Sequence, residues 1–123
     1  MSAHQMICHL NDSFRAVMGE REVSSACGVL QRTVIRAIAL HVPLRWPPGV
    51  ATRPEIDQQS GGTAPTDFVS DVADLEALVG RFTAMVQEGG TLRPHPIFGP
   101  LTRREWLRWG YLHTDHHLRQ FGA

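Results

Sequence analysis

Two histidines near the end of the chain, His113 and His117, have the spacing of a metal-binding pair. Residues four apart on an α-helix project from the same face, so both imidazoles can reach one ion through a ring nitrogen. His116 is turned about 60° away from His113 around the helix axis, and Asp115 about 200°. The spacing indicates a metal site on this face, and a solvated or hydrogen-bonded histidine face is the alternative.

A third ligand must come from elsewhere, because a catalytic metal site typically has three protein ligands and a water. The remaining histidines are candidates, namely His4, His9, His41 and His95. We favour His9, which is flanked by apolar residues in a helical pattern that could pack against the last helix. Asp12, one turn after His9, either orients its imidazole as a hydrogen-bonded carboxylate or is a surface charge.

The residues around the histidine pair limit the chemistry. Thr114 stands where an HExxH motif has its catalytic glutamate, which argues against a zincin protease. Since no carboxylate shares the face of His113 and His117, thiol chemistry or simple binding is favoured over hydrolysis. Trp109 lies on roughly the face of His113 and is either a core residue or part of a pocket.

No general base stands out, and the candidates are Tyr111, His116 and Asp12. Cys8 has no basic neighbour to activate it and is expected to be a small buried apolar residue. A histidine-based pH sensor is a further possibility, since imidazole titrates near neutrality, but it explains the spacing less well.

Four helices are expected to position these residues, and the absence of any strand-like alternation predicts an all-α fold. Capping boxes at Ser2 with Gln5 and at Thr102 with Glu105 indicate two of the helix starts. Apolar repeats in the two middle helices predict inward-facing stripes of a bundle. The expected helices span about residues 2–18, 29–42, 66–88 and 102–120, with the stripes at Leu30, Val34, Ile38 and Val42 and at Phe68, Val72, Leu75, Val79, Phe82 and Val86.

A Pro- and Gly-rich segment, residues 43–65, is expected to be a long surface crossover that could contact a partner. The chain of 123 residues is near the usual size of one domain, so we expect a single domain over residues 1–123. Its zero formal net charge predicts no binding to nucleic acid or to anionic membranes. Two unpaired cysteines and the lack of a signal peptide or apolar span predict a cytoplasmic protein.

Three blocks, "HQMICHLNDSFRAVMG", "RPEIDQQSGGTAPTDFVSDVADLEAL" and "HPIFGPLTRREWLRWGYLHTDHHLRQFG", resemble the DinB-like superfamily of metal-binding helical bundles. Within it they resemble a subgroup that ends in "HTDHHLRQFG". The resemblance implies a four-helix bundle with one metal site, held by a histidine of the second helix and an HxxxH pair of the fourth. On this chain the implied ligands are His9, His113 and His117.

The departure from the family lies at the start, because the helix before the one with the first histidine is missing here or is replaced by residues 29–42. A second copy of the chain could also cover the exposed apolar seam, so a homodimer is expected. The resemblance implies one divalent transition metal ion, zinc or nickel first and then iron. It also implies thiol S-transferase or hydrolase chemistry on a small-molecule substrate such as a low-molecular-weight thiol. The alternative is a non-catalytic, metal-stabilised bundle that binds a small ligand or a protein.

Overall fold

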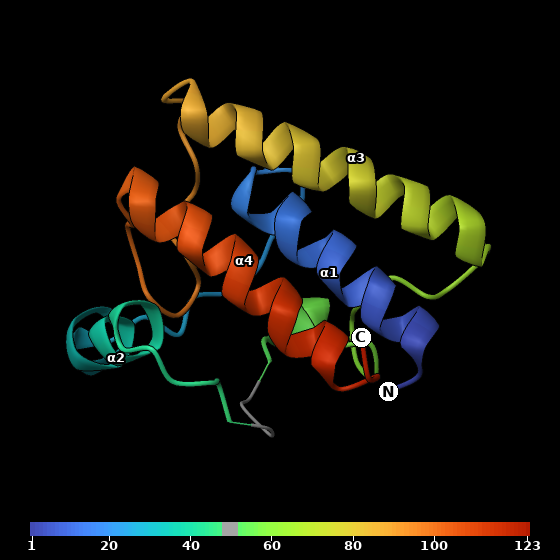
Figure 1. The fold of residues 1–123 in the computed structure, drawn as a ribbon, viewed down its shortest axis with the longest axis horizontal. Helices are drawn as coiled ribbons and strands as arrows, with labels where there is room; N and C mark the ends of the chain where they lie inside the picture. Colours follow the sequence, from blue (N-terminus) through green and yellow to red (C-terminus); the bar gives the residue numbers. More distant parts are fainter. Residues whose placement is uncertain (48–51) are drawn as a thin grey trace. The chain divides into compact units, whose positions relative to one another are not determined.

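The structure, a computed structural model, describes residues 1–47 and 52–123 and is all-helical (Figure 1). Its elements are α1 (Ala3–Val17), η1 (Gln31–Ile35, a π-helix), α2 (Arg36–His41), η2 (Pro54–Ile56, a 3-10 helix), α3 (Phe68–Gln87) and α4 (Arg103–Arg119). The described residues form no strand, so the predicted all-α class is confirmed. Within the described residues, no helix has the length and apolar character needed to cross a membrane.

Side chains cap the starts of the three long helices, where backbone N–H groups have no carbonyl partner within the helix. Ser2 and Thr102 each accept from the backbone N–H three residues on, and Gln5 and Glu105 reciprocate, so both predicted capping boxes are present. Asp67 caps α3 by accepting from the N–H of Ser70 at 2.9 Å. These starts are set by local sequence, which is why they lie close to the positions expected from the sequence.

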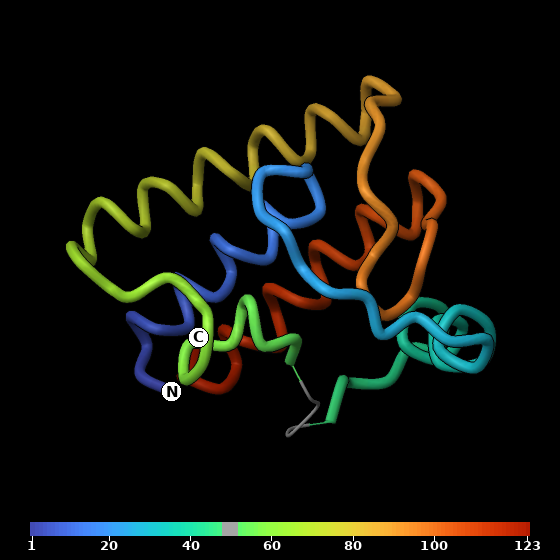
Figure 2. Tube along the Cα trace, turned by 180° about the vertical axis from the view of Figure 1, so that it is seen from behind, coloured from blue at the N-terminus to red at the C-terminus, as the bar shows by residue number. Residues whose placement is uncertain are grey.

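The described residues divide into two compact units, each made of two separate stretches of the chain. The first unit comprises Met1–Val23 and Thr52–Arg93. In it α1 and α3 lie side by side and run in the same direction (Figures 1 and 2). Phe14 and Phe82 meet edge to face, with ring centroids 5.1 Å apart. Phe82 and Val86, the last two residues of the predicted stripe on α3, are buried, whereas Phe68 at its start is half exposed.

The crossover between the middle helices is not structureless in its described part. From Thr52 onward it contains η2 and folds against α1, where the carboxylate of Asp12 accepts hydrogen bonds from the backbone N–H and the hydroxyl of Thr63, at 2.8 and 2.7 Å. Arg21 donates to the carbonyl oxygens of Glu55 and Gly61. This stretch is therefore part of the first unit, while residues 48–51 of the predicted crossover lie outside the described residues.

The second unit comprises the described residues of Ser24–Ala51 together with Pro94–Ala123. Here α2 packs on α4 through Leu40, which is fully buried, and Arg108 donates from Nε to the carbonyl oxygen of Leu40. Glu105 is buried at the start of α4, and its carboxylate is compensated by Arg36 at 3.4 Å and by His41 at 2.9 Å.

The predicted inward stripe on the second helix is wrong. Leu30, Val34 and Ile38 are 56%, 50% and 51% exposed. The side that meets α4 instead includes Arg36 and Leu40, because the buried carboxylate of Glu105 needs cationic partners and Arg36 supplies one. The covered face of this helix thus carries an ion pair with a residue far along the chain as well as the buried Leu40.

Candidate metal centre

The histidine pair of α4 has the arrangement predicted from its spacing. The ring centroids of His113 and His117 lie 4.8 Å apart, and His117 is buried. Nδ1 of His117 lies 3.0 Å from the amide oxygen Oε1 of Gln120. Because that oxygen can only accept, Nδ1 donates and Nε2 keeps the lone pair that binds metals.

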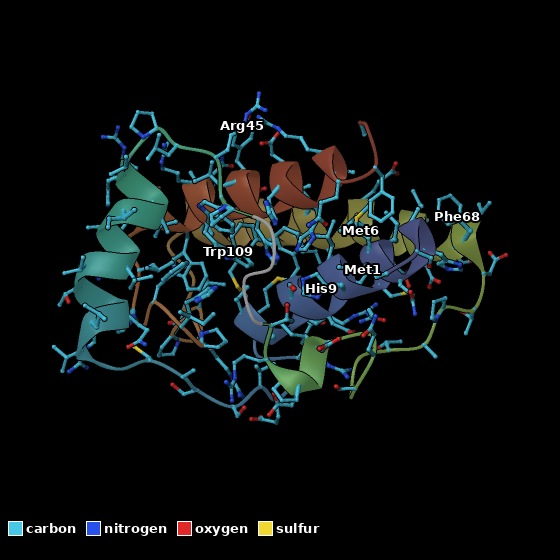
Figure 3. All side chains as sticks on the ribbon, turned by 90° about the horizontal axis from the view of Figure 1, so that it is seen from below. Met1, Met6, His9, Arg45, Phe68 and Trp109 are labelled. Atoms are coloured by element: carbon cyan, nitrogen blue, oxygen red, sulfur yellow. The ribbon has the colours of Figure 1, made fainter. Side chains whose placement is uncertain are left out.

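In the first unit, His9, labelled in Figure 3, also has an oxygen acceptor at Nδ1. It lies on α1 and is 3% exposed, and its Nδ1 lies 2.8 Å from the carbonyl oxygen of Ile56 in η2. The carbonyl can only accept, so this imidazole too has the tautomer with the lone pair on Nε2. Burial lowers the pKa of His9 below its usual value, which keeps the ring neutral at neutral pH.

Asp12 helps to orient the imidazole of His9 by holding the segment that follows Thr52. Its carboxylate is fully buried, so the alternative of a surface charge is wrong. It accepts hydrogen bonds from Thr63 and from Gln58 at 3.2 Å, and Arg21 lies 3.6 Å away. These contacts hold the segment that presents the carbonyl of Ile56 to His9, so Asp12 is a positioning residue for that imidazole.

Aromatic side chains surround the histidine pair within the second unit. The indole of Trp109, labelled in Figure 3, is buried, with its centroid 5.2 Å from that of His113. His116 lies 5.1 Å from His117, again between ring centroids. Tyr111, by contrast, is 66% exposed and lies on the solvent side of α4. Of the predicted pocket residues on α4, Trp109 and His116 lie beside the pair and Tyr111 does not.

The comparisons with known proteins give one match. A family model described as "Protein of unknown function (DUF1569)" matches residues 2–123, almost the whole chain. The chain belongs to the DUF1569 family. The search of curated proteins and the search of solved structures gave no match. The resemblance to DinB-like proteins accordingly stays a prediction for this DUF1569 chain.

The other histidines of the DUF1569 chain are engaged elsewhere. His41 pairs with Glu105, and His4 lies 2.6 Å from a carboxylate oxygen of Asp71. Nδ1 of His95 accepts from the backbone N–H groups of Ile97 and Phe98, and burial lowers the pKa of His95 to about 3. These contacts count against His4, His41 and His95 as third ligands and leave His9 as the favoured candidate.

Three groups near the histidines were not anticipated from the sequence. The amide of Gln120 could have been found, because it lies three residues after His117, at the C-terminal cap of α4. Trp46, whose ring centroid is 6.1 Å from those of His113 and His116, comes from a loop and has no sequence signal. The carbonyl of Ile56 is a backbone group, which sequence cannot single out.

The donor set suits a transition metal. His9, His113 and His117 offer three imidazole groups that could hold a metal ion. Two of these rings donate from Nδ1 to an oxygen, the contact that orients most metal-binding histidines and raises their basicity. All-nitrogen ligation fits zinc, nickel or iron rather than magnesium or calcium, which prefer oxygen.

Proposed function

We propose that this protein binds one divalent transition metal ion, zinc or nickel first and then iron, through His9, His113 and His117. The observation that carries the proposal is the oxygen acceptor at Nδ1 of both His9 and His117. Both rings are thereby held with Nε2 available as the ligand atom. The lowered pKa of His9 adds support, because a neutral imidazole need not lose a proton before it binds the ion.

We further propose that the site is enzymatic and acts on a low-molecular-weight thiol. An ion with three imidazole ligands retains an open position and acts as a Lewis acid, able to hold a thiolate or a water. The chain's own part is to place the rings and to exclude water, which the buried indole of Trp109 does beside His113. Asp115, the carboxylate within the HTDHH segment, is paired with Arg119 at 2.8 Å, which favours thiol transfer over base-assisted hydrolysis.

The alternative is a metal-stabilised domain without catalysis that binds a small ligand or a protein. It is favoured by the chemistry of metal binding, because an ion held by side chains of two different helices stabilises a fold whether or not a reaction follows.

Metal content tests the proposed site. Both proteins are purified without a His-tag. We expect the parent to hold about one ion per chain and the His113→Ala/His117→Ala variant to hold none, because two of the three ligands are gone. Inductively coupled plasma mass spectrometry measures this, and His41→Ala serves as a control that removes a histidine from α2. Equal metal in the parent and the double variant, after incubation with zinc, nickel or iron(II), would refute the site.

A thiol-transfer assay separates the two functions. We expect the metal-loaded protein to accelerate the addition of a low-molecular-weight thiol to monochlorobimane, and the double variant to lose this rate. A metal-loaded parent that shows no turnover with a panel of thiols and metals would favour the non-catalytic domain.

We also propose that a second copy of the chain covers the exposed stripe of Leu30, Val34 and Ile38. Apolar side chains that repeat every four residues on one face can pack against the same face of a symmetry mate. Light scattering should give twice the mass of one chain, and Val34→Glu should halve it. Val69→Glu, at an exposed valine of α3, is the matched control, and a monomeric parent would contradict the proposal.

A further inference from the structure

Within the first unit, three side chains that bind metals in other proteins meet between α1 and α3. His4 and Cys8 lie one helical turn apart on α1, and Asp71 lies in the first turn of α3. Oδ2 of Asp71 is 2.6 Å from Nε2 of His4 and 3.6 Å from Sγ of Cys8. These residues are separate from the three histidines of the proposed centre.

The separations suit a small tetrahedral ion. One donor atom of each residue lies within 4.8 Å of those of the other two. Around a tetrahedral zinc ion, sulfur, nitrogen and oxygen ligands lie roughly 3.3–3.6 Å from one another. The contact between Cys8 and Asp71 already has this length, and rotation of the His4 side chain can lengthen its 2.6 Å contact with Asp71 to match.

The surrounding contacts hold this cluster in place. Asn11, on the same face of α1, donates from Nδ2 to the backbone carbonyl of Asp71 at 3.0 Å and so ties the start of α3 to α1. Among the described residues, Oδ1 of Asn11 is a buried oxygen without a hydrogen-bond partner. The ring of Phe68 meets that of His4 edge to face, with 5.3 Å between centroids.

The cluster is buried on one side and open on the other. Cys8 is 2% exposed, whereas the side chains of His4 and Asp71 are 24% and 15% exposed. A water can therefore reach the fourth position of an ion from the solvent side. Sulfur and nitrogen ligands favour zinc over magnesium or calcium, and three protein ligands with one water is a common zinc arrangement.

We propose a second metal site, in which His4, Cys8 and Asp71 bind one zinc ion and join the first turns of α1 and α3. The thiol of Cys8 loses its proton to solvent as sulfur binds the ion, which is the usual course at cysteine sites. Without metal, the same residues form a hydrogen-bonded cluster around Asp71.

Cobalt(II) is the probe, because a thiolate ligand gives it an intense near-ultraviolet charge-transfer band that imidazole and carboxylate ligands do not. The full-length His113→Ala/His117→Ala variant is titrated with cobalt, so the proposed three-histidine centre takes no part. We expect a saturable band that zinc abolishes. In this background Cys8→Ala should lose the band, and Cys27→Ala, which removes the other thiol, should keep it.

The His4→Gln variant tests whether His4 is a metal ligand or only a hydrogen-bond partner of Asp71. The glutamine amide can still donate to Asp71, but the imidazole that would bind the ion is gone. We expect cobalt affinity to fall by more than about 100-fold, since even outer contacts of metal sites are worth 10–100-fold. The proposal is overturned if the His113→Ala/His117→Ala protein is folded by circular dichroism and shows no band, if the band is lost in Cys27→Ala and kept in Cys8→Ala, or if His4→Gln binds cobalt as tightly. Since His113 and His117 are absent throughout, neither result depends on the proposed function.

Discussion

Asp12→Ala is expected to lower the free energy of unfolding by about 3–5 kcal/mol, the usual cost of removing one partner from a buried charged network. The carboxylate is fully buried and accepts hydrogen bonds from Thr63 and Gln58, with Arg21 beside it. Its loss leaves the backbone N–H of Thr63 without this acceptor. The segment that follows Thr52 should therefore detach from α1.

Urea unfolding of the metal-free protein measures this loss, with Asp74→Ala as the matched control. Asp74 pairs with Arg15 at 3.5 Å on an exposed surface, where such a pair is worth about 0.2–1 kcal/mol. Hydrogen exchange should show the lost protection at residues 52–63. Because this loop carries the carbonyl that orients His9, metal affinity should also fall about 10–100-fold. Equal destabilisation by the two alanine variants would contradict the role given to Asp12.

Acidification from pH 7 to pH 5 is expected to remove about 2 kcal/mol of stability through His95 alone. Burial lowers the pKa of His95 to about 3, whereas the unfolded chain has the ordinary value near 6.5. Below pH 6.5 the His95 imidazole binds a proton in the unfolded chain but not in the folded protein. The stability from His95 is therefore complete above pH 6.5 and is lost progressively as pH falls towards 3.

His95→Asn tests the assignment, because the amide oxygen of asparagine can accept from Ile97 and Phe98 as Nδ1 does but does not titrate. Chemical unfolding of the metal-free parent and variant at pH 7, 6 and 5 gives the comparison. The carboxyl groups whose pKa is lowered, such as Glu105, add their effect only below about pH 4.5. An unchanged pH dependence in the variant would exclude His95 as its source.

What the sequence could predict was local. The capping boxes depend on residues three apart, and the facing of His113 and His117 depends on residues four apart, so the chain itself specifies them. The covered side of α2 could not be predicted in this way. That side makes contacts far along the chain, such as the one between His41 and Glu105, which are 64 residues apart.

The surroundings of His9 were predictable only in part. A carboxylate one turn away indicated that Asp12 could matter, but not that it would bind a loop 51 residues further along the chain. The acceptor at Nδ1 is a backbone carbonyl, and any residue at position 56 would present the same oxygen. Sequence patterns identify ligand atoms on side chains well and miss the main-chain groups that orient them.

Because main-chain atoms of the loop orient His9, many side chains of the loop can be substituted without disturbing that histidine. Helix α1 and Arg21 hold the loop at the carbonyls of Glu55, Ile56 and Gly61, together with the N–H of Thr63. Apart from the hydroxyl of Thr63, which donates to Asp12, the exposed side chains of the loop take little part in this attachment. These other exposed side chains are free to vary in evolution, or in a designed library, while the imidazole of His9 keeps its orientation, so the surface chemistry of the loop can change at little cost to the fold.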